Sequence, residues 1–169
     1  MPRVYVGIGS NIDRSRNVRS GVAALREAFG DVELSEVYEV PAVGFEGDPF
    51  FNLVAAFDTG LEVDDVVRIL RGIEDAHQRV RGGERYAPRT LDIDLLLYGD
   101  LVLRREDLKL PRADVEKFDF VLRPLAEIAP EGRHPVTGRT FAEMWRQFPY
   151  EKQPVSIVPA LFVAGEAEP

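Results

Sequence analysis

Two aspartates separated by one residue, Asp92 and Asp94, are the strongest candidates for chemistry in this sequence. They lie in the run LDIDLLL of residues 91–97, which suits a β-strand, so both carboxylates are expected on one face. The apolar residues expected on the other face are Leu91, Ile93, Leu95 and Leu97. Neighbouring carboxylates repel each other unless a bound cation or hydrogen bonds offset their negative charge. Mg²⁺ is such a cation, because it binds a few carboxylate oxygens together with water and phosphate oxygens. For an isolated pair, a strand that faces solvent is the simpler interpretation, so the surrounding residues decide.

Four arginines precede this strand, although the chain carries a net charge of −8: Arg79, Arg81, Arg85 and Arg89. Guanidinium groups pair with phosphate oxygens in a bidentate manner and stabilise the charge that develops during transfer. Gly82 and Gly83 would let the intervening loop close over a ligand. A solvated helix end is the alternative for the arginines alone. Beside the aspartate pair, they favour a magnesium-dependent enzyme that transfers a phosphoryl-type group from ATP to a small molecule.

A third group combines a loop, aromatic rings and an amide at the start of a strand: Pro41, Gly44, Phe45, Phe50, Phe51 and Asn52. Flat ring faces and one amide suit a planar heterocycle with donors and acceptors on its edge. The alternative is an ordinary core edge, which is the preferred interpretation on these residues alone.

The composition limits the classes of protein that fit. With 169 residues and 45% apolar positions, the chain suits one domain with its own core. Because cysteine is absent, disulfides and thiolate sites are excluded. The negative charge disfavours nucleic-acid and anionic-membrane binding, although RNA-recognition modules share the element order predicted below. No secretory signal or membrane span is found, so a cytoplasmic enzyme is expected.

Apolar periodicity predicts six core elements in the order β-α-β-β-α-β. They are strand 4–8, a helix that is capped at Asp13 or Ser15 and has its apolar positions between residues 18 and 29, strand 32–40 with a bulge near Glu36, strand 51–57, helix 63–80 and strand 91–98. This order predicts an α+β, ferredoxin-like fold with an antiparallel sheet and both helices on one face. Further helices are expected at 120–128, interrupted by Pro124, and at 140–148. A peripheral strand and an acidic tail are expected from residue 154 onward.

The arginine cluster and the following run PRTLDIDL of residues 88–95 closely resemble the signature of the 6-hydroxymethyl-7,8-dihydropterin pyrophosphokinase family. Other segments recur in the family's order: residues 9–11, residues 38–44 leading to Asn52, Glu74, and residues 120–130. The resemblance implies one pyrophosphokinase domain over residues 1–169, of which the last ~15 form a peripheral tail. It implies transfer of pyrophosphate from Mg-ATP to the hydroxymethyl group of the pterin, with release of AMP, in folate biosynthesis.

The resemblance also implies roles for single residues. Asp92 and Asp94 would hold two Mg²⁺ ions that bridge the triphosphate, while Arg79 and Arg89 would act in catalysis by clamping phosphates. The other residues implied at the ATP site are Glu74, Arg81, Arg85, Leu95, Lys109 and Arg112. The pterin would lie between Phe51 and Phe120, and the other residues implied around it are Pro41, Val43, Gly44, Asn52 and Tyr86.

Four positions depart from the family's pattern. Arg112 stands where a histidine is usual, Phe118 where an arginine is usual, Arg71 where glutamine is common and Tyr86 where tryptophan is common. An active but divergent, monomeric enzyme is expected, with ATP and the pterin as its only partners. The alternative is a catalytically weakened relative that still binds pterin or nucleotide. His77 and His134 show no partner in the sequence and are expected to be structural.

Overall fold

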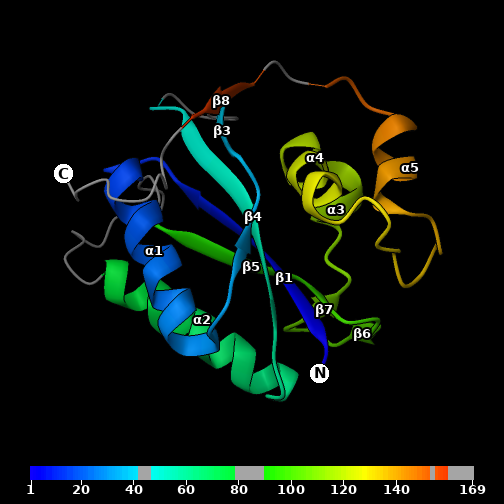
Figure 1. Ribbon diagram of the computed structural model, residues 1–169, viewed down its shortest axis with the longest axis horizontal. Coiled ribbons are helices and arrows are strands. Elements are labelled where there is room, and N and C mark those ends of the chain that lie inside the picture. Colours follow the sequence, from blue (N-terminus) through cyan, green and yellow to red (C-terminus); the bar gives the residue numbers. More distant parts are fainter. Residues whose placement is uncertain (42–46, 79–89, 153–154, 160–169) are drawn as a thin grey trace.

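The computed structural model describes residues 1–41, 47–78, 90–152 and 155–159. The strands of its central sheet are β1 (Arg3–Ser10), β2 (Glu33–Leu34), β3 (Val37–Val40), β4 (Phe50–Asp58), β5 (Asp92–Tyr98) and β8 (Ser156–Val158). They pair antiparallel in the order β5-β1-β4-β3-β8, and β2 also pairs with β4. The strand that carries both aspartates is therefore an edge strand beside β1 (Figure 1).

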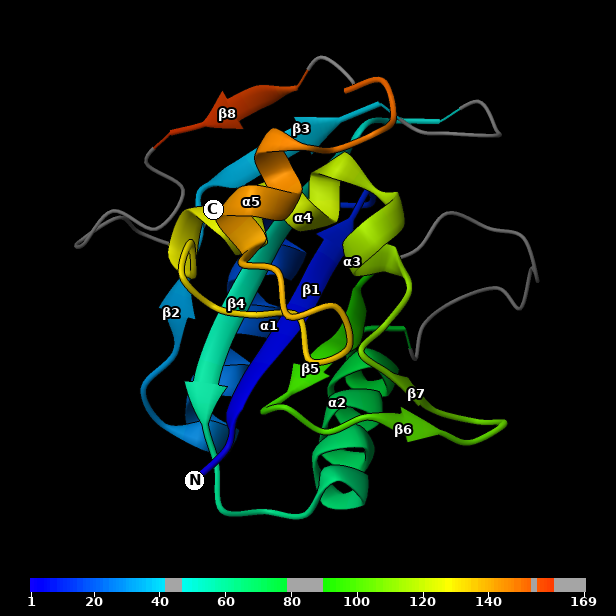
Figure 2. The same ribbon diagram turned by 90° about the vertical axis from the view of Figure 1, so that its right-hand side faces the viewer.

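Helices cover both faces of this sheet. Figure 1 shows α1 (Arg14–Phe29) and α2 (Val63–Gln78) on one face, and α3 (Asp114–Lys117), α4 (Asp119–Ile128) and α5 (Phe141–Arg146) on the other. In Figure 2 the second group lies in front of β1 and β4, with α1 behind them. The predicted α+β fold is confirmed, with α1 and α2 on one face, and the strand order is consistent with the predicted ferredoxin-like core.

Each helical layer buries its own apolar cluster against the sheet. Val22 of α1 and Leu70 of α2 are at most 3% exposed in the first cluster. Leu125 of α4 and Phe141 of α5 are at most 1% exposed in the second, where Leu96 of β5 packs against them. Full burial of one such side chain contributes roughly 1.5–3 kcal/mol to stability, so both layers hold the sheet that carries the site.

The strand expected over residues 32–40 is broken, which is the form that the predicted bulge takes. Ser35 replaces the regular pairing because its backbone N donates to Val54 O at 2.9 Å and its Oγ accepts from Val54 N at 2.9 Å. The next amide, Glu36 N, donates to Glu127 Oε2 of α4 at 2.8 Å. Residue Glu36, in the break between β2 and β3, is thus bonded to α4. Strand β3 then continues toward the site.

The prediction that Leu97 shares a face with Leu95 is wrong. The register of β1 and β5 shifts between Tyr5 and Val6, so Tyr5 lies opposite Leu97 while Val6 lies opposite Leu95. The extra residue, Leu96, packs with Leu97 in the second cluster, whereas Leu95 packs in the first. A β-bulge of this kind breaks the alternation of period two. The alternation holds before it, so the expected common face of Asp92 and Asp94 is preserved.

The predicted start of α1 is confirmed, whereas the predicted interruption of α4 is wrong. Helix α1 begins at Arg14, and Asp13, one of its two predicted caps, occupies the N-cap at φ 42° without a side-chain cap bond. Helix α4 runs through Pro124 without interruption. A proline removes the bond to the carbonyl four residues earlier, and here burial of the flanking residues Leu122 and Leu125 compensates for that loss.

Three short elements were not predicted: α3, and the strands β6 (Leu103–Arg104) and β7 (Lys109–Leu110), which form a separate two-stranded sheet. The helix expected at 140–148 is the shorter α5, which begins at a capping box between Thr140 and Glu143. The peripheral strand is confirmed as β8, and residues 160–169 lie outside the described part of the chain. Within the described ranges, no helix is long and apolar enough to cross a membrane.

His134 has partners that the sequence did not reveal. Its side chain is 3% exposed, its Nε2 lies 3.0 Å from Glu116 Oε1 of α3, and its Nδ1 accepts from the backbone N atoms of Val136 and Thr137. Nε2 must therefore carry the proton when the imidazole is neutral. Burial lowers the pKa of His134, and this effect outweighs the opposing charge of Glu116.

Acidification is expected to weaken the fold through His134. The unfolded chain binds a proton near the ordinary value of 6.5, whereas the folded protein binds it only at lower pH, so the free energy of unfolding falls as the pH drops below that value. Urea unfolding at about pH 7.5 and about pH 5.5 measures the difference. His134→Gln is expected to show a smaller difference. An equal pH dependence in both proteins would contradict this role.

Candidate active site

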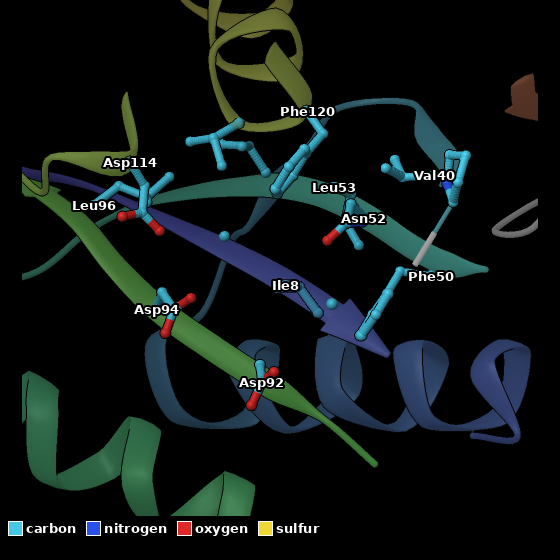
Figure 3. Close-up of a pocket in the computed structure, with 15 residues that line it drawn as sticks. Ile8, Val40, Phe50, Asn52, Leu53, Asp92, Asp94, Leu96, Asp114 and Phe120 are labelled. Carbon is cyan, nitrogen blue, oxygen red and sulfur yellow. The ribbon is translucent and has the colours of Figure 1, made fainter. Parts of the chain in front are cut away.

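The site is a cavity of about 280 Å³ between β5, β1 and β4 on one side and α3 and α4 on the other. We call it the central cavity. Its polar side chains are Asn52, Asp92, Asp94 and Asp114, and the rings of Phe50 and Phe120 also line it. Figure 3 shows these side chains around one space, with the carboxylates toward β5 and the rings toward the ends of β4 and α4. Carboxylates predicted from one segment and aromatic residues predicted from others therefore meet in a single place.

Glycines on β1 form the floor between the two halves of the cavity. Gly7 lies opposite Asp94 and Gly9 opposite Asp92 in the strand pairing, and Gly9 also faces Asn52 of β4. A Cβ atom at Gly9 would come within 2.8 Å of Asn52 Oδ1, which is too close for any real side chain. The glycine is therefore required for the Asn52 carboxamide to lie over β1.

The aspartate pair sits on the edge strand, and Glu74 supports it from behind. Ile93 N, between the two aspartates, donates to Glu74 Oε2 of α2 at 2.8 Å. An edge strand leaves alternate amides without a partner strand, so this bond fixes the backbone that carries both carboxylates. Glu74 was predicted at the ATP site, and the structure places it against this strand rather than in the lining of the central cavity.

Arg112 lies between two of the cavity's carboxylates. Its Nη2 is 3.8 Å from Asp94 Oδ1, and its Nε is 3.2 Å from Asp114 Oδ2. Burial alone lowers the pKa of the Arg112 guanidinium, but the charges of Asp94, Asp114 and Asp92 outweigh burial and raise the pKa above its ordinary value. The side chain is therefore a fixed positive charge at the carboxylate end of the cavity.

The carboxylate end fits a magnesium ion that arrives with phosphate. Asp92 and Asp94 come from the same face of β5, and Asp94 is 44% exposed at its side chain, so its oxygens are accessible. Among the described residues, no group of three or more His, Cys, Asp or Glu side chains could enclose a metal. Mg²⁺ typically uses one or two carboxylates and completes its shell with water and substrate phosphates, which matches such an open pair.

The prediction that Phe51 stacks in the site is wrong, because the neighbouring Phe50 occupies that position. Phe50 lines the central cavity, whereas Phe51 is 6% exposed in the cluster under α1. There the guanidinium carbon of Arg14 lies 4.1 Å from the centroid of the Phe51 ring. The signal was present in the sequence: residues two apart share a strand face, so if Asn52 faces the ligand, Phe50 must do so too.

This register predicts that the two neighbouring phenylalanines contribute to different properties, Phe50 to substrate binding and Phe51 to stability. Phe50→Ala is expected to raise the KM for a flat aromatic substrate about tenfold, because a stacked ring face is lost. Phe51→Ala is expected to lower the free energy of unfolding by about 3 kcal/mol, because it leaves a cavity in the core. Steady-state kinetics and urea unfolding of both variants check the assignment. If Phe51→Ala had the larger effect on KM, the register would be contradicted.

The remaining predicted site residues divide into three groups. Pro41, Asn52 and Phe120 line the central cavity together with the aspartates. Leu95 is 5% exposed in the first core cluster, and Lys109 lies on β7 with Nζ 3.4 Å from Glu106 O, so neither lines the cavity. The predicted residues outside the described part of the chain are Val43, Gly44, Arg79, Arg81, Arg85, Tyr86 and Arg89. Asp114 was missed because it lies on α3, which no sequence pattern indicated.

Comparisons with known proteins agree on one family. The sequence model described as 7,8-dihydro-6-hydroxymethylpterin-pyrophosphokinase (HPPK) matches residues 5–130. The 2-amino-4-hydroxy-6-hydroxymethyldihydropteridine pyrophosphokinase of Pseudomonas aeruginosa is 38% identical over 153 residues, which are 88% of this chain and 93% of that protein. The enzyme of the same name from Aquifex aeolicus is 37% identical over 147 residues, which are 85% of this chain and 90% of that protein.

Solved structures support the same fold. A crystal structure of wild-type Plasmodium falciparum HPPK-DHPS matches with a TM-score of 0.68 and 13% identity over 87% of this chain. A structure of HPPK-DHPS in complex with substrates matches with a TM-score of 0.68 and 12% identity. This chain spans less than half of those longer chains, 44% and 43% respectively.

Proposed function

Because this chain belongs to the 7,8-dihydro-6-hydroxymethylpterin-pyrophosphokinase family and is thus an ATP-dependent pyrophosphokinase of folate biosynthesis, we propose that the central cavity is its active site. There the pyrophosphoryl group of ATP passes to the hydroxymethyl oxygen of 6-hydroxymethyl-7,8-dihydropterin. A bond forms between that oxygen and the β-phosphorus. The bond from the β-phosphorus to the oxygen that bridges it to the α-phosphorus breaks, the hydroxyl proton is lost, and AMP leaves. We place this chemistry in one domain over residues 1–169.

One observation carries the proposal: a slot lined by aromatic rings and a carboxylate pair share one cavity. Phe50 and Phe120 supply apolar ring faces, and Asn52 supplies an amide that can bond the edge of a heterocycle. Asp92 and Asp94 lie at the other end of the same space. A pterin in the slot would therefore direct its hydroxymethyl group toward the carboxylate end, where the triphosphate binds.

The carboxylate end would hold magnesium through Asp92 and Asp94, and we propose two ions there. When bound, Mg²⁺ neutralises phosphate charge and favours attack at the β-phosphorus. The chain's own contribution is to fix both carboxylates. Pairing with β1 orients the strand, and Glu74 bonds the backbone between the aspartates. When the backbone and rotamers of such residues are fixed in advance, these groups need not rearrange as the transition state forms.

Positive side chains at this end would act on the phosphates. Arg112 already lies 3.8 Å from Asp94, so its charge can reach a phosphate oxygen near the same carboxylate. We propose that Arg79 and Arg89 clamp the transferred group during catalysis, as the family signature implies. Arg81 and Arg85 are proposed at the ATP site from their positions in the sequence, and so are Glu74, Leu95 and Lys109, which lie outside the lining of the central cavity. Because Arg112 supplies a cation at this position, replacement of the family's usual histidine is compatible with turnover.

The remaining proposed residues surround the pterin. Pro41, at the end of β3, lines the cavity beside Phe50, and Val40 lines it next to them. Val43, Gly44 and Tyr86 are proposed pterin-site residues from their positions in the sequence. Recognition would thus combine ring stacking with a few polar groups on the edge of the heterocycle, the usual composition of a small-molecule pocket.

Phosphorus NMR of the pterin product tests the proposed chemistry. A pyrophosphate ester is expected to give two phosphorus resonances that are coupled to each other. A single uncoupled resonance on the pterin would mean that only one phosphoryl group is transferred. Binding of the pterin without any phosphorylated product would instead favour the alternative of a catalytically weakened relative, and would contradict the proposal.

A further inference from the structure

Phe118 is an exposed aromatic residue that belongs to neither core cluster. It is 41% exposed and lies at the junction of α3 and α4. Its backbone is fixed there, because its N donates to Asp114 O at 3.0 Å and its O accepts from Val121 N at 3.1 Å and Leu122 N at 3.0 Å. A ring that is held at a rigid junction but contributes little to the core is a candidate for a functional role.

The ring of Phe118 stacks on the ring of Phe120. The two centroids are 5.1 Å apart and the planes differ by 22°, which is an offset-stacked arrangement. Phe120 lines the central cavity and packs against the second core cluster, whereas Phe118 belongs to neither. Phe118 thus covers part of the Phe120 ring from outside the cavity and restricts the orientations that this ring can adopt.

We propose that Phe118 is a positioning residue for the pterin: it fixes the plane of the Phe120 ring against which the flat substrate stacks. The proposal rests on the function proposed above, because it takes the pterin as the molecule in the slot. An unsupported phenylalanine can rotate about its side-chain bonds and must be ordered when a ligand binds, which weakens binding. An aromatic side chain at position 118 orders the Phe120 ring before the ligand binds, so binding does not carry the cost of ordering it. Phe118 would therefore act on the pterin and not on the nucleotide.

Kinetics of Phe118→Ala test this role. The KM for the pterin is expected to rise about three- to tenfold, the range given by loss of one aromatic pair, while kcat and the KM for ATP stay within about twofold. Phe118→Tyr keeps the ring and is expected to restore the wild-type KM. Tyr150→Ala is the matched control, because Tyr150 is 57% exposed and its ring contacts Phe148 edge-to-face instead. This control is expected to change neither KM.

A double-mutant cycle with Phe120→Ala shows whether Phe118 acts through its neighbour. If it does, Phe118→Ala has no further effect on the pterin KM once Phe120 has been truncated. An unchanged pterin KM in Phe118→Ala, an equal rise in both KM values, or full additivity in the cycle would each overturn the inference. These outcomes differ from a failure of the proposed function, which would appear in the wild-type enzyme as no pterin-dependent AMP.

Discussion

Replacement of Asp94 by alanine is expected to lower kcat about a thousandfold, because a metal ion contributes several kcal/mol to stabilisation of the transition state. Binding of the pterin is expected to persist, since the ring slot of Phe50, Asn52 and Phe120 lies at the other end of the cavity. The fold should also persist, because Asp94 is part-exposed on an edge strand. Single-turnover assays with Mg-ATP, pterin fluorescence titration and urea unfolding measure these three quantities separately.

Asp65→Ala is the matched control for this variant. Asp65 is an aspartate on α2 whose only described ion pair is with Arg68 at 2.7 Å, and it is not part of the cavity lining. It should leave kcat unchanged. Near-normal turnover in Asp94→Ala would mean that the carboxylate pair does not bind the metal. A parallel loss of pterin binding would mean that the variant disturbs the slot as well, and the proposed division of the cavity into two ends would be wrong.

Replacement of Arg89 by alanine is expected to lower kcat by about a hundred- to a thousandfold, the usual cost of removing one group that stabilises developing charge. Arg89 lies outside the described residues, but its neighbour Thr90 is fixed by a hydrogen bond from Ser10 Oγ to the Thr90 carbonyl. That bond anchors the chain two residues before Asp92. Because Arg89 is proposed to act on phosphate, the KM for the pterin should change by less than about threefold.

Arg68→Ala provides the control for loss of one arginine, since Arg68 is exposed on α2 and its described partner is Asp65. Steady-state kinetics with each substrate varied in turn distinguish the outcomes. A loss of pterin affinity as large as the loss of kcat in Arg89→Ala would contradict a role on the phosphates. Partial recovery with Arg89→Lys would indicate that charge alone supplies part of the effect, whereas recovery to full activity would argue against a bidentate contact.

The sequence was sufficient to predict the parts of the fold that follow regular periodicity. Alternating apolar residues in β1 and β5 and helical spacing in α1 and α2 predicted the core order, and the local alternation correctly placed Asp92 and Asp94 on one face. The family signature then connected these carboxylates with the aromatic residues of β4 and α4, which lie far away in the chain. The structure brings both groups into one cavity.

The errors arose where a single residue changes the register or a short element lacks periodicity. Leu97 was misplaced because a bulge at Leu96 cannot be read from a run of leucines. Phe51 was chosen over Phe50 because two adjacent aromatic residues offer the same chemistry, and only the strand face distinguishes them. Asp114 escaped notice because a four-residue helix has no periodic pattern, so nothing predicted that its carboxylate would line the cavity beside Asp94.

The distribution of nucleotide products tests the central claim most directly. The enzyme is incubated with Mg-ATP, with and without 6-hydroxymethyl-7,8-dihydropterin, and AMP and ADP are resolved by ion-exchange chromatography. Transfer of a pyrophosphoryl group requires AMP that forms only when the pterin is present, in an amount equal to the pterin consumed. ADP in place of AMP would mean simple phosphoryl transfer, and it would contradict the proposed attack at the β-phosphorus.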